Sequence, residues 1–444
     1  MIEDREPFEH TIIFDCGSYT FCSLQTLGET QTPKLISSTP NTPRPQRFIG
    51  PTRDEFWMHI IYLGAGRGEK SAKIHWRKLP HSYRINFFIT LIPKEKMDEH
   101  TMQFSYSEDD FNFCSKTGSN SMFDQILKTE WKNKMANACF RYELGDLRTK
   151  ILPGNFNFIV QLNVKRAIER RKPQLISDIV MPFDNEKFHF GKVKEKEIIF
   201  IIQPQHWFES KPENTKEDFK HILLINVSPL EFGHSLLVPH VDKCSPQVLN
   251  FEALRLAVEI MLISSDNFLR LGFNSLGAFA SVNHLHFHAY YLKYKMYLES
   301  APVIHLKGRC YILTSFPSEG FVFELLKKED IVDVVSSVMV LIDFLVEEKI
   351  PHNVFLTRGK RFTTSEENWE ICPLRVYVWA REAYFGTKND HSFNVAVCEL
   401  AGHIPIKDEN SYECITEEDI SLCLKNACHN TFVSIKNDVK KLYE

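Results

Sequence analysis

Polar and apolar residues alternate with a period of two through residues 283–289. Three histidines, His284, His286 and His288, occupy every second position, and apolar residues fill the gaps. A period of two is typical of a β-strand, so the sequence predicts a half-buried strand with all three imidazoles on one face. Side chains two residues apart on a strand lie roughly 6–7 Å from one another. That spacing suits three rings arrayed along an extended polyphosphate.

Elsewhere the pattern predicts short strands with a few helices between them. Apolar residues at helical spacing predict helices over 251–263 and 331–345. Strands are expected over 155–163, 197–202 and 374–381, and in the N-terminal region over 56–63 and 83–91. The Pro/Ser/Thr-rich segment 37–46 is expected to be a loop. Few helices among many strands indicate the α+β class.

Three interpretations of the histidine strand compete. It could be purely structural, although three histidines on one apolar-backed face have no packing reason. Two of the three could bind zinc with a further ligand, but no cysteine pair or His-Glu-x-x-His helix accompanies them. Nucleophilic catalysis by His286, the middle histidine, explains the arrangement best.

Five colinear blocks then identify a family resemblance. The His-apolar-His-apolar-His pattern is the signature of the histidine triad superfamily, and its surroundings resemble the GDP-hexose phosphorylases, which include animal GDP-D-glucose and plant GDP-L-galactose enzymes. The resemblance covers roughly residues 120 to 444, in colinear order. The blocks are 140–154, 161–164 with 170–173, 225–239, 273–292 and 393–406.

The resemblance implies an architecture of two half-barrel units, as in galactose-1-phosphate uridylyltransferase. Residues 116–300 are expected to form the catalytic unit and residues 301–444 the second unit. Residues 1–115 match nothing in the family and are expected to be dispensable for the chemistry.

The reaction implied by the resemblance is GDP-D-glucose plus inorganic phosphate giving GDP and D-glucose 1-phosphate. His286 would form a guanylyl-histidine intermediate, His284 would orient its ring, and His288 would bond phosphate oxygens. Histidine at the third triad position favours GDP-D-glucose over GDP-L-galactose as the substrate. No metal or other cofactor is needed, because imidazoles and backbone donors supply the charge stabilisation.

Seven further residues are expected to bind the substrate. The resemblance implies that a hydroxyl three residues before the first triad histidine bonds the reacting phosphate, and that a further histidine lies on the strand beside the catalytic one. Nearby amides, a glycine and two arginines could also contact phosphate. The competing interpretation is a capped turn for the loop residues and a solvated charge for each arginine. The residues are Ser281, Asn283, Asn274, Gly277, His234, Arg375 and Arg381.

Composition limits the alternatives. A net charge of −4 argues against a nucleic-acid or membrane-surface binder. The 11 scattered cysteines and an N-terminus without an apolar segment indicate a cytoplasmic chain, which could pair as a homodimer. A GDP-hexose hydrolase, a GDP-L-galactose phosphorylase and a non-catalytic guanine-nucleotide-binding regulatory protein remain open as other functions.

Overall fold

The computed structural model divides into two compact units, Met1–His100 and Thr101–Glu444. In the second unit it describes residues 101–113, 121–171, 173–207, 220–362, 372–385 and 392–444. In the first unit it describes only the backbone of seven strands, so the predicted loop at 37–46 lies outside the described residues. These strands are β1 (Asp15–Cys16), β2 (Tyr19–Phe21), β3 (Gln25–Thr26), β4 (Arg47–Phe48), β5 (Phe56–Tyr62), β6 (Lys70–Arg77) and β7 (Asn86–Pro93).

The first unit is a seven-stranded sheet in the order β1-β2-β7-β6-β5-β4, and β3 also pairs with β7. Its pairings are antiparallel, as in β5 against β6. The strand predicted over 56–63 is confirmed as β5, and the one predicted over 83–91 begins later, at Asn86 of β7.

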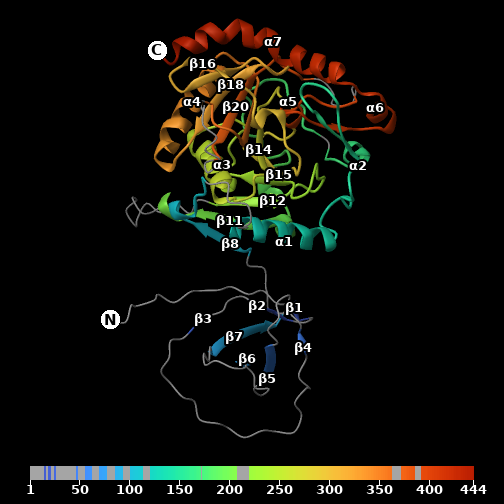
Figure 1. Cartoon of the computed structure of the whole chain (residues 1–444), viewed down its shortest axis with the longest axis vertical. Coiled ribbons are helices and arrows are strands. Elements are labelled where there is room, and N and C mark those ends of the chain that lie inside the picture. The colour runs from blue at the N-terminus through green and yellow to red at the C-terminus, as the bar shows by residue number, and fades with distance from the viewer. Residues whose placement is uncertain are drawn as a thin grey trace. The chain divides into compact units, whose positions relative to one another are not determined.

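An eleven-stranded sheet dominates the second unit (Figure 1). Its order is β16-β17-β18-β20-β19-β14-β15-β13-β12-β11-β8. The members are β8 (Gln103–Tyr106), β11 (Ile198–Pro204), β12 (His221–Ile225), β13 (Ser235–Val238), β14 (Leu269–Asn274), β15 (Phe287–Tyr291), β16 (Ile304–Lys307), β17 (Cys310–Leu313), β18 (Gly320–Leu325), β19 (His352–Arg358) and β20 (Leu374–Ala380). A second sheet has the order β21-β10-β9, formed by β9 (Thr149–Ile151), β10 (Ile159–Leu162) and β21 (His403–Ile406).

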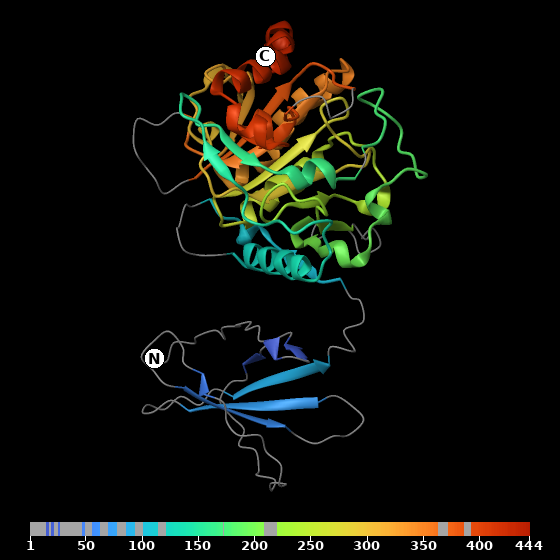
Figure 2. The ribbon, with the colours of Figure 1, turned by 90° about the vertical axis from the view of Figure 1, so that its right-hand side faces the viewer.

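Helices cover the large sheet on both sides (Figure 2). The helix predicted over 251–263 is confirmed over the same residues, and the one predicted over 331–345 extends to Glu347. The helices are α1 (Met122–Ala136), α2 (Val164–Ile168), α3 (Phe251–Ile263), α4 (Ile331–Glu347), α5 (Val397–Leu400), α6 (Glu409–Cys414) and α7 (Glu417–Lys441). The mixture of helices and sheets agrees with the expected α+β composition.

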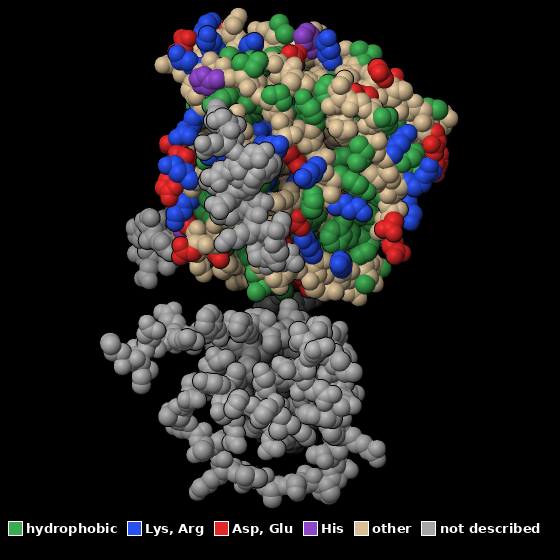
Figure 3. Space-filling view, viewed as in Figure 1, with side chains coloured by type: hydrophobic (Ala, Val, Ile, Leu, Met, Phe, Trp, Pro, Cys, Tyr) green, Lys and Arg blue, Asp and Glu red, His purple; other side chains and the backbone are tan. Residues whose placement is uncertain are grey.

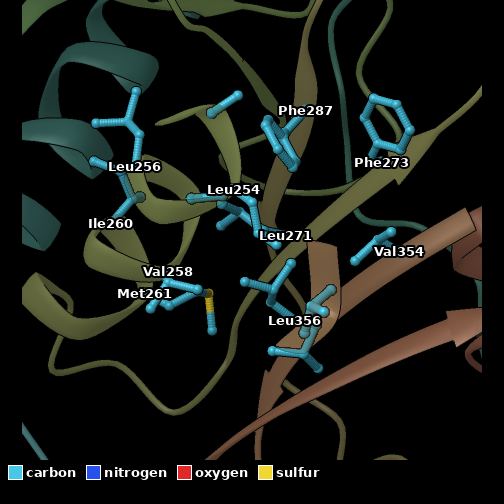
Figure 4. Packing of buried hydrophobic residues seen from close by; sticks show 14 of the residues in the cluster. Leu254, Leu256, Val258, Ile260, Met261, Leu271, Phe273, Phe287, Val354 and Leu356 are labelled. Carbon is cyan, nitrogen blue, oxygen red and sulfur yellow. The ribbon is translucent and has the colours of Figure 1, made fainter. Parts of the chain in front are cut away.

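Alternate residues of the central strands pack into two separate hydrophobic cores. Leu271 and Leu356 face α3, whose Leu254, Val258 and Met261 pack beside them (Figure 4). Neighbouring residues on the same strands face the three-stranded sheet and α5 instead. Burial on both faces explains why β14, β19 and β20 are buried along their whole length.

The strand predicted over 155–163 is only half correct. The ladder with β21 begins at Ile159. Before it, the amides of Asn155 and Phe156 donate to the Glu417 carboxylate at 2.8 and 3.0 Å, and Asn157 has a φ of 50°. These contacts turn the chain, so the first residues of the segment cannot join the sheet.

The boundary between the two units lies earlier than the predicted residue 115. β8 pairs in parallel with β11, Gln103 opposite Ile201, and so belongs to the large sheet. Residues 101–113 therefore go with the unit that contains the histidines.

Candidate active site

The histidine motif lies where a central strand begins. β15 starts at Phe287, between β13 and β14, with His288 opposite Leu236 and Gly272. His284 and His286 precede the strand, so the prediction that all three lie on one strand is wrong. The reason is that the His286 amide donates to the Gln247 side-chain oxygen at 2.9 Å and not to a neighbouring strand.

Two oxygens determine the proton position on His286. Its Nδ1 lies 2.7 Å from the His284 carbonyl oxygen and 2.9 Å from Gln247 Oε1. The orientation of the Gln247 side-chain amide is determined by its Nε2, which donates to the carbonyls of Asn274 (2.9 Å) and His286 (3.1 Å). Because both neighbours of Nδ1 are acceptors, Nδ1 carries the proton and Nε2 carries the lone pair.

His288 takes the opposite tautomer. The Leu230 amide donates to His234 Nδ1 at 2.7 Å, so His234 carries its proton on Nε2. That Nε2 lies 3.0 Å from His288 Nδ1, which accepts and leaves the proton of His288 on its own Nε2. Burial, followed by the nearby Arg166 charge, holds the pKa of His234 well below its usual value and keeps it neutral. The 3.3 Å contact of the Asn226 amide nitrogen with the same Nε2 is the weaker one.

His284 is enclosed and does not line the cavity. Its Nδ1 accepts from the Phe190 amide at 3.0 Å, and its ring stacks on that of Phe190. Burial, then the neighbouring His286 and His189, lowers its pKa to about 3. Through its carbonyl it orients His286, and its own imidazole packs away from the cavity.

A cavity opens beside His286 and His288. Its lining includes an apolar cluster and several charged side chains, three of them arginines. Of the expected residues, Asn274, Ser281 and His234 line it together with those two histidines. The apolar cluster consists of Phe190, Val193, Leu224, Leu236 and Val282. The charged residues in the wall of the cavity are Arg166, Arg170, Arg171, Glu197, Glu399 and Lys407.

Two of the expected loop residues, Asn283 and Gly277, bond other parts of the chain near the histidines. The Asn283 side-chain oxygen accepts from the backbone N–H of Gln247 at 2.9 Å, and the Asn283 side-chain nitrogen donates to the carbonyls of Met181 and Pro182. Gly277 adopts a φ of 72°, and its carbonyl accepts from the Tyr384 amide. Neither residue lines the cavity.

The two expected arginines are also placed elsewhere. Arg375 is buried and donates to the carbonyls of Leu298 (3.0 Å), Ala301 (2.9 Å) and Lys360 (2.7 Å). Arg381 donates to the carbonyls of Glu382 and Val395. Their guanidinium groups bond backbone oxygens, and neither residue lines the cavity.

Sequence reasoning missed several groups at the site. Gln247 has no motif of its own and reaches His286 only through the fold. Arg170 and Glu399 lie inside the blocks 170–173 and 393–406, so the blocks themselves held the signal. Gly233, with a φ of 71°, lies against the Tyr291 ring, where a Cβ would come within 2.5 Å of the ring, so its role is packing and not ligand approach.

The residues that the structure describes contain no group of three or more histidine, cysteine, aspartate or glutamate side chains placed to hold a metal ion. Within the same residues no helix is long and apolar enough to cross a membrane.

Two family models match the second unit, one in each half. Residues 122–290 match the family described as GDPGP1-like, N-terminal domain, and residues 297–444 match GDPGP1-like, C-terminal domain. The chain belongs to this GDPGP1-like family.

The chain is also similar to individual proteins of known name. GDP-D-glucose phosphorylase 1 of Danio rerio is 44% identical, over 71% of this chain and 91% of the relative, and that of Homo sapiens is 40% identical, over 67% and 77%. GDP-L-galactose phosphorylase 2 of Arabidopsis thaliana is 31% identical, over 67% and 70%. Among solved structures, yeast Ap4A phosphorylase Apa2 in complex with AMP has a TM-score of 0.44 at 15% identity, covering 70% of this chain and 94% of that one.

Proposed function

We propose that the chain is a GDP-D-glucose phosphorylase, which converts GDP-D-glucose and inorganic phosphate into GDP and D-glucose 1-phosphate. Family membership and relatives named for this activity support the proposal. The observation that carries the mechanism is the tautomer of His286, whose Nδ1 faces two acceptors and whose Nε2 therefore has the lone pair.

In the first step Nε2 of His286 attacks the α-phosphorus of the nucleotide sugar. An N–P bond forms and the bond from the α-phosphorus to the bridging oxygen breaks, releasing glucose 1-phosphate. The positive charge on the ring is shared by the Nδ1 proton, which the His284 carbonyl and Gln247 accept. In the second step a phosphate oxygen attacks the same phosphorus, the N–P bond breaks, and GDP leaves.

His288 is placed to donate to the oxygens of the reacting phosphate. Its Nε2 carries a proton because Nδ1 accepts from His234. A fixed donor stabilises charge on phosphate oxygens without reorganisation during the reaction. Ser281 and Asn274 line the same cavity and supply further polar groups.

The apolar cluster in the cavity lining suits a nucleobase, because Phe190 and its aliphatic neighbours offer apolar contacts for a ring. The ring of Phe190 lies 4.9 Å from that of His286, so a base on this surface would place its phosphates near Nε2.

We also propose that residues 116–300 and 301–444 act as two half-barrel units joined edge to edge. The pairing of Leu271 on β14 with Leu356 on β19 would be their seam, and the two family matches divide at the same part of the chain. The cytoplasmic location and a homodimer stay predictions.

The deciding experiment follows GDP-glucose labelled in the α-phosphate, with and without inorganic phosphate. A phosphorylase releases labelled GDP at a rate that rises with phosphate concentration. GMP formed at a rate indifferent to phosphate would indicate the hydrolase, and binding without turnover would indicate the regulatory protein. Parallel assays with GDP-L-galactose separate the two phosphorylase specificities.

A further inference from the structure

Three arginines lie in the wall of the cavity. Arg166 lies on α2, and Arg170 and Arg171 follow its end. The Asn163 side chain caps this helix by accepting from the Arg166 amide at 3.1 Å. A short capped helix followed by two more arginines therefore brings three arginines to the lining of the cavity that also contains His286 and His288. The guanidinium of Arg171 stacks on the Phe188 ring, 3.3 Å from its centroid.

Repulsion between like charges opposes this arrangement unless an anion lies between them. Burial, and then the Arg166 charge, lowers the pKa of Arg170. Burial also lowers the pKa of Arg171, which Glu197 partly offsets and Arg141 reinforces. Within the described part of the chain, neither Arg166 nor Arg171 lies within ion-pair distance of a carboxylate.

The other charged groups of the wall leave it positive. Lys407 adds a fourth cation, against the two carboxylates Glu197 and Glu399. Burial raises the pKa of Glu399, which favours its neutral form. A cavity with this balance attracts an anion, and planar guanidinium groups match the geometry of phosphate oxygens.

The wall adjoins the His288 side of the site. The Arg166 charge is second only to burial in lowering the pKa of His234, the residue that bonds His288. Arg166 is also anchored, because its Nη1 donates to the Ser228 carbonyl. Arg166 lines the same cavity as His286 and His288.

We propose that Arg166, Arg170 and Arg171 form the binding site for the acceptor, inorganic phosphate. This inference rests on the proposed phosphorylase reaction. Both displacements occur in line with Nε2 of His286, so the incoming phosphate occupies the position that the phosphate of glucose 1-phosphate has left. One oxygen of the held phosphate forms a bond to the α-phosphorus while the bond to Nε2 breaks and GDP leaves.

The test isolates the second half of the reaction. Full-length enzyme is loaded with labelled GDP-glucose without phosphate, separated from free nucleotide, and discharged either in buffer or in inorganic phosphate. Release as GMP reports attack by water, and release as GDP reports attack by phosphate. Arg166→Gln and Arg170→Gln are each expected to slow GDP release at least about 10-fold at subsaturating phosphate, with GMP release within about 3-fold of wild type.

Two further variants make the comparison specific. Lys165→Gln is the matched control, because Lys165 lies on the same helix, is exposed and does not line the cavity. It is expected to behave as wild type. Arg166→Lys keeps a positive charge without the forked geometry, so its GDP release should fall between those of wild type and Arg166→Gln.

Equal slowing of GDP and GMP release in the glutamine variants would overturn the proposal and assign the arginines to the nucleotide. Unchanged GDP release would overturn it as well. A separate measurement on the unloaded enzyme, thermal stabilisation by inorganic phosphate, should be lost in Arg166→Gln and Arg170→Gln and kept in Lys165→Gln. Wild-type enzyme that is stabilised by phosphate but never releases GDP would contradict the phosphorylase reaction and leave the anion site standing.

Discussion

His286, just before β15, and Arg375, on β20, are both buried, but the hydrogen bonds of the two regions differ in kind. At the start of β15, His286 and His288 each use Nδ1 for a hydrogen bond, and this bond determines whether Nε2 carries a proton. Both histidines line the cavity. On β20, Arg375 donates hydrogen bonds to backbone carbonyls and to the Tyr377 hydroxyl. A buried polar group is therefore a candidate for chemistry when its partners define an atom that faces a cavity.

The surface does not reveal this difference. On the face of the second unit shown in Figure 3, basic and acidic side chains are interspersed with hydrophobic ones. The contrast between the two strands lies inside the protein, so each of the following variants is expected to affect either the rate or the stability.

The largest effect is expected from His286→Ala. Loss of the nucleophile should lower kcat by about 10⁴-fold or more. Stability should fall by no more than about 1–2 kcal/mol, because only the Nδ1 contacts are lost. Steady-state assays and thermal melts are compared with those of His305→Ala, an exposed histidine. Retained turnover in His286→Ala would end the assignment of the nucleophile.

The opposite behaviour is expected on β20. Arg375→Met leaves the carbonyls of Leu298, Ala301 and Lys360 buried without their donor, so the free energy of unfolding should fall by about 3–5 kcal/mol. The folded fraction should keep its kcat. Arg309→Met, which removes an exposed ion pair, is the control, with an expected cost of about 0–1 kcal/mol. A stable but inactive Arg375→Met would place this strand in the chemistry after all.

His234 is expected to act on the rate through His288. His234→Leu removes the donor that fixes the His288 tautomer, so kcat should fall about 10–100-fold with little change in KM. His234→Gln can still donate and should recover most of the rate. If both variants are equally impaired, the role of His234 is packing and not control of the tautomer.

The buried neutral histidines predict loss of stability in acid. Burial lowers the pKa of His352 to about 4, below the usual value of 6.5. Between these two values the unfolded chain binds more protons, so stability falls as the pH decreases through 6.5 toward 4. At pH 5 this one residue should cost about 2 kcal/mol relative to pH 8.

His352→Asn tests this value, since its amide can still donate to the Ile350 carbonyl as Nδ1 does. Urea unfolding at pH 8 and pH 5 should show a smaller difference for the variant than for wild type. An identical difference would mean that His352 does not titrate on unfolding in this range.

Removal of residues 1–100 is expected to have the smallest effect on the chemistry. A chain that begins at Thr101 keeps β8 and therefore the edge of the large sheet. Its kcat should stay within about 2-fold of that of the full-length protein, because the described residues that line the cavity all belong to the second unit. A folded but inactive product would show that the first unit contributes to the reaction.

The sequence predicted the elements that have a strong local pattern. The helix at 251–263 and the strand at 374–381 were found because their apolar spacing follows the period of one element. The period on β20 also grouped Arg375 with Tyr377 correctly, and these two side chains are hydrogen-bonded. The period of a strand does not show which layer its face packs against, so the expectation that Arg375 lies at the substrate site had no support from the pattern.

Long-range contacts explain what else was missed. Gln247 bonds the amide, the ring and the carbonyl of His286, yet nothing near it in the sequence indicates this. The same contacts keep His286 out of the strand that the alternation predicted. Tautomers depend on partners from several loops, and only the folded chain brings those partners together.

The central claim is that Nε2 of His286 becomes bonded to the α-phosphorus. Enzyme incubated with α-labelled GDP-glucose without phosphate, quenched in alkali and digested, should yield a guanylylated peptide that contains residues 284–288. Fragmentation should place the group on His286, and added phosphate should release it as GDP at a rate no slower than turnover. Turnover without any adduct, or an adduct on His284 or His288, would contradict the account.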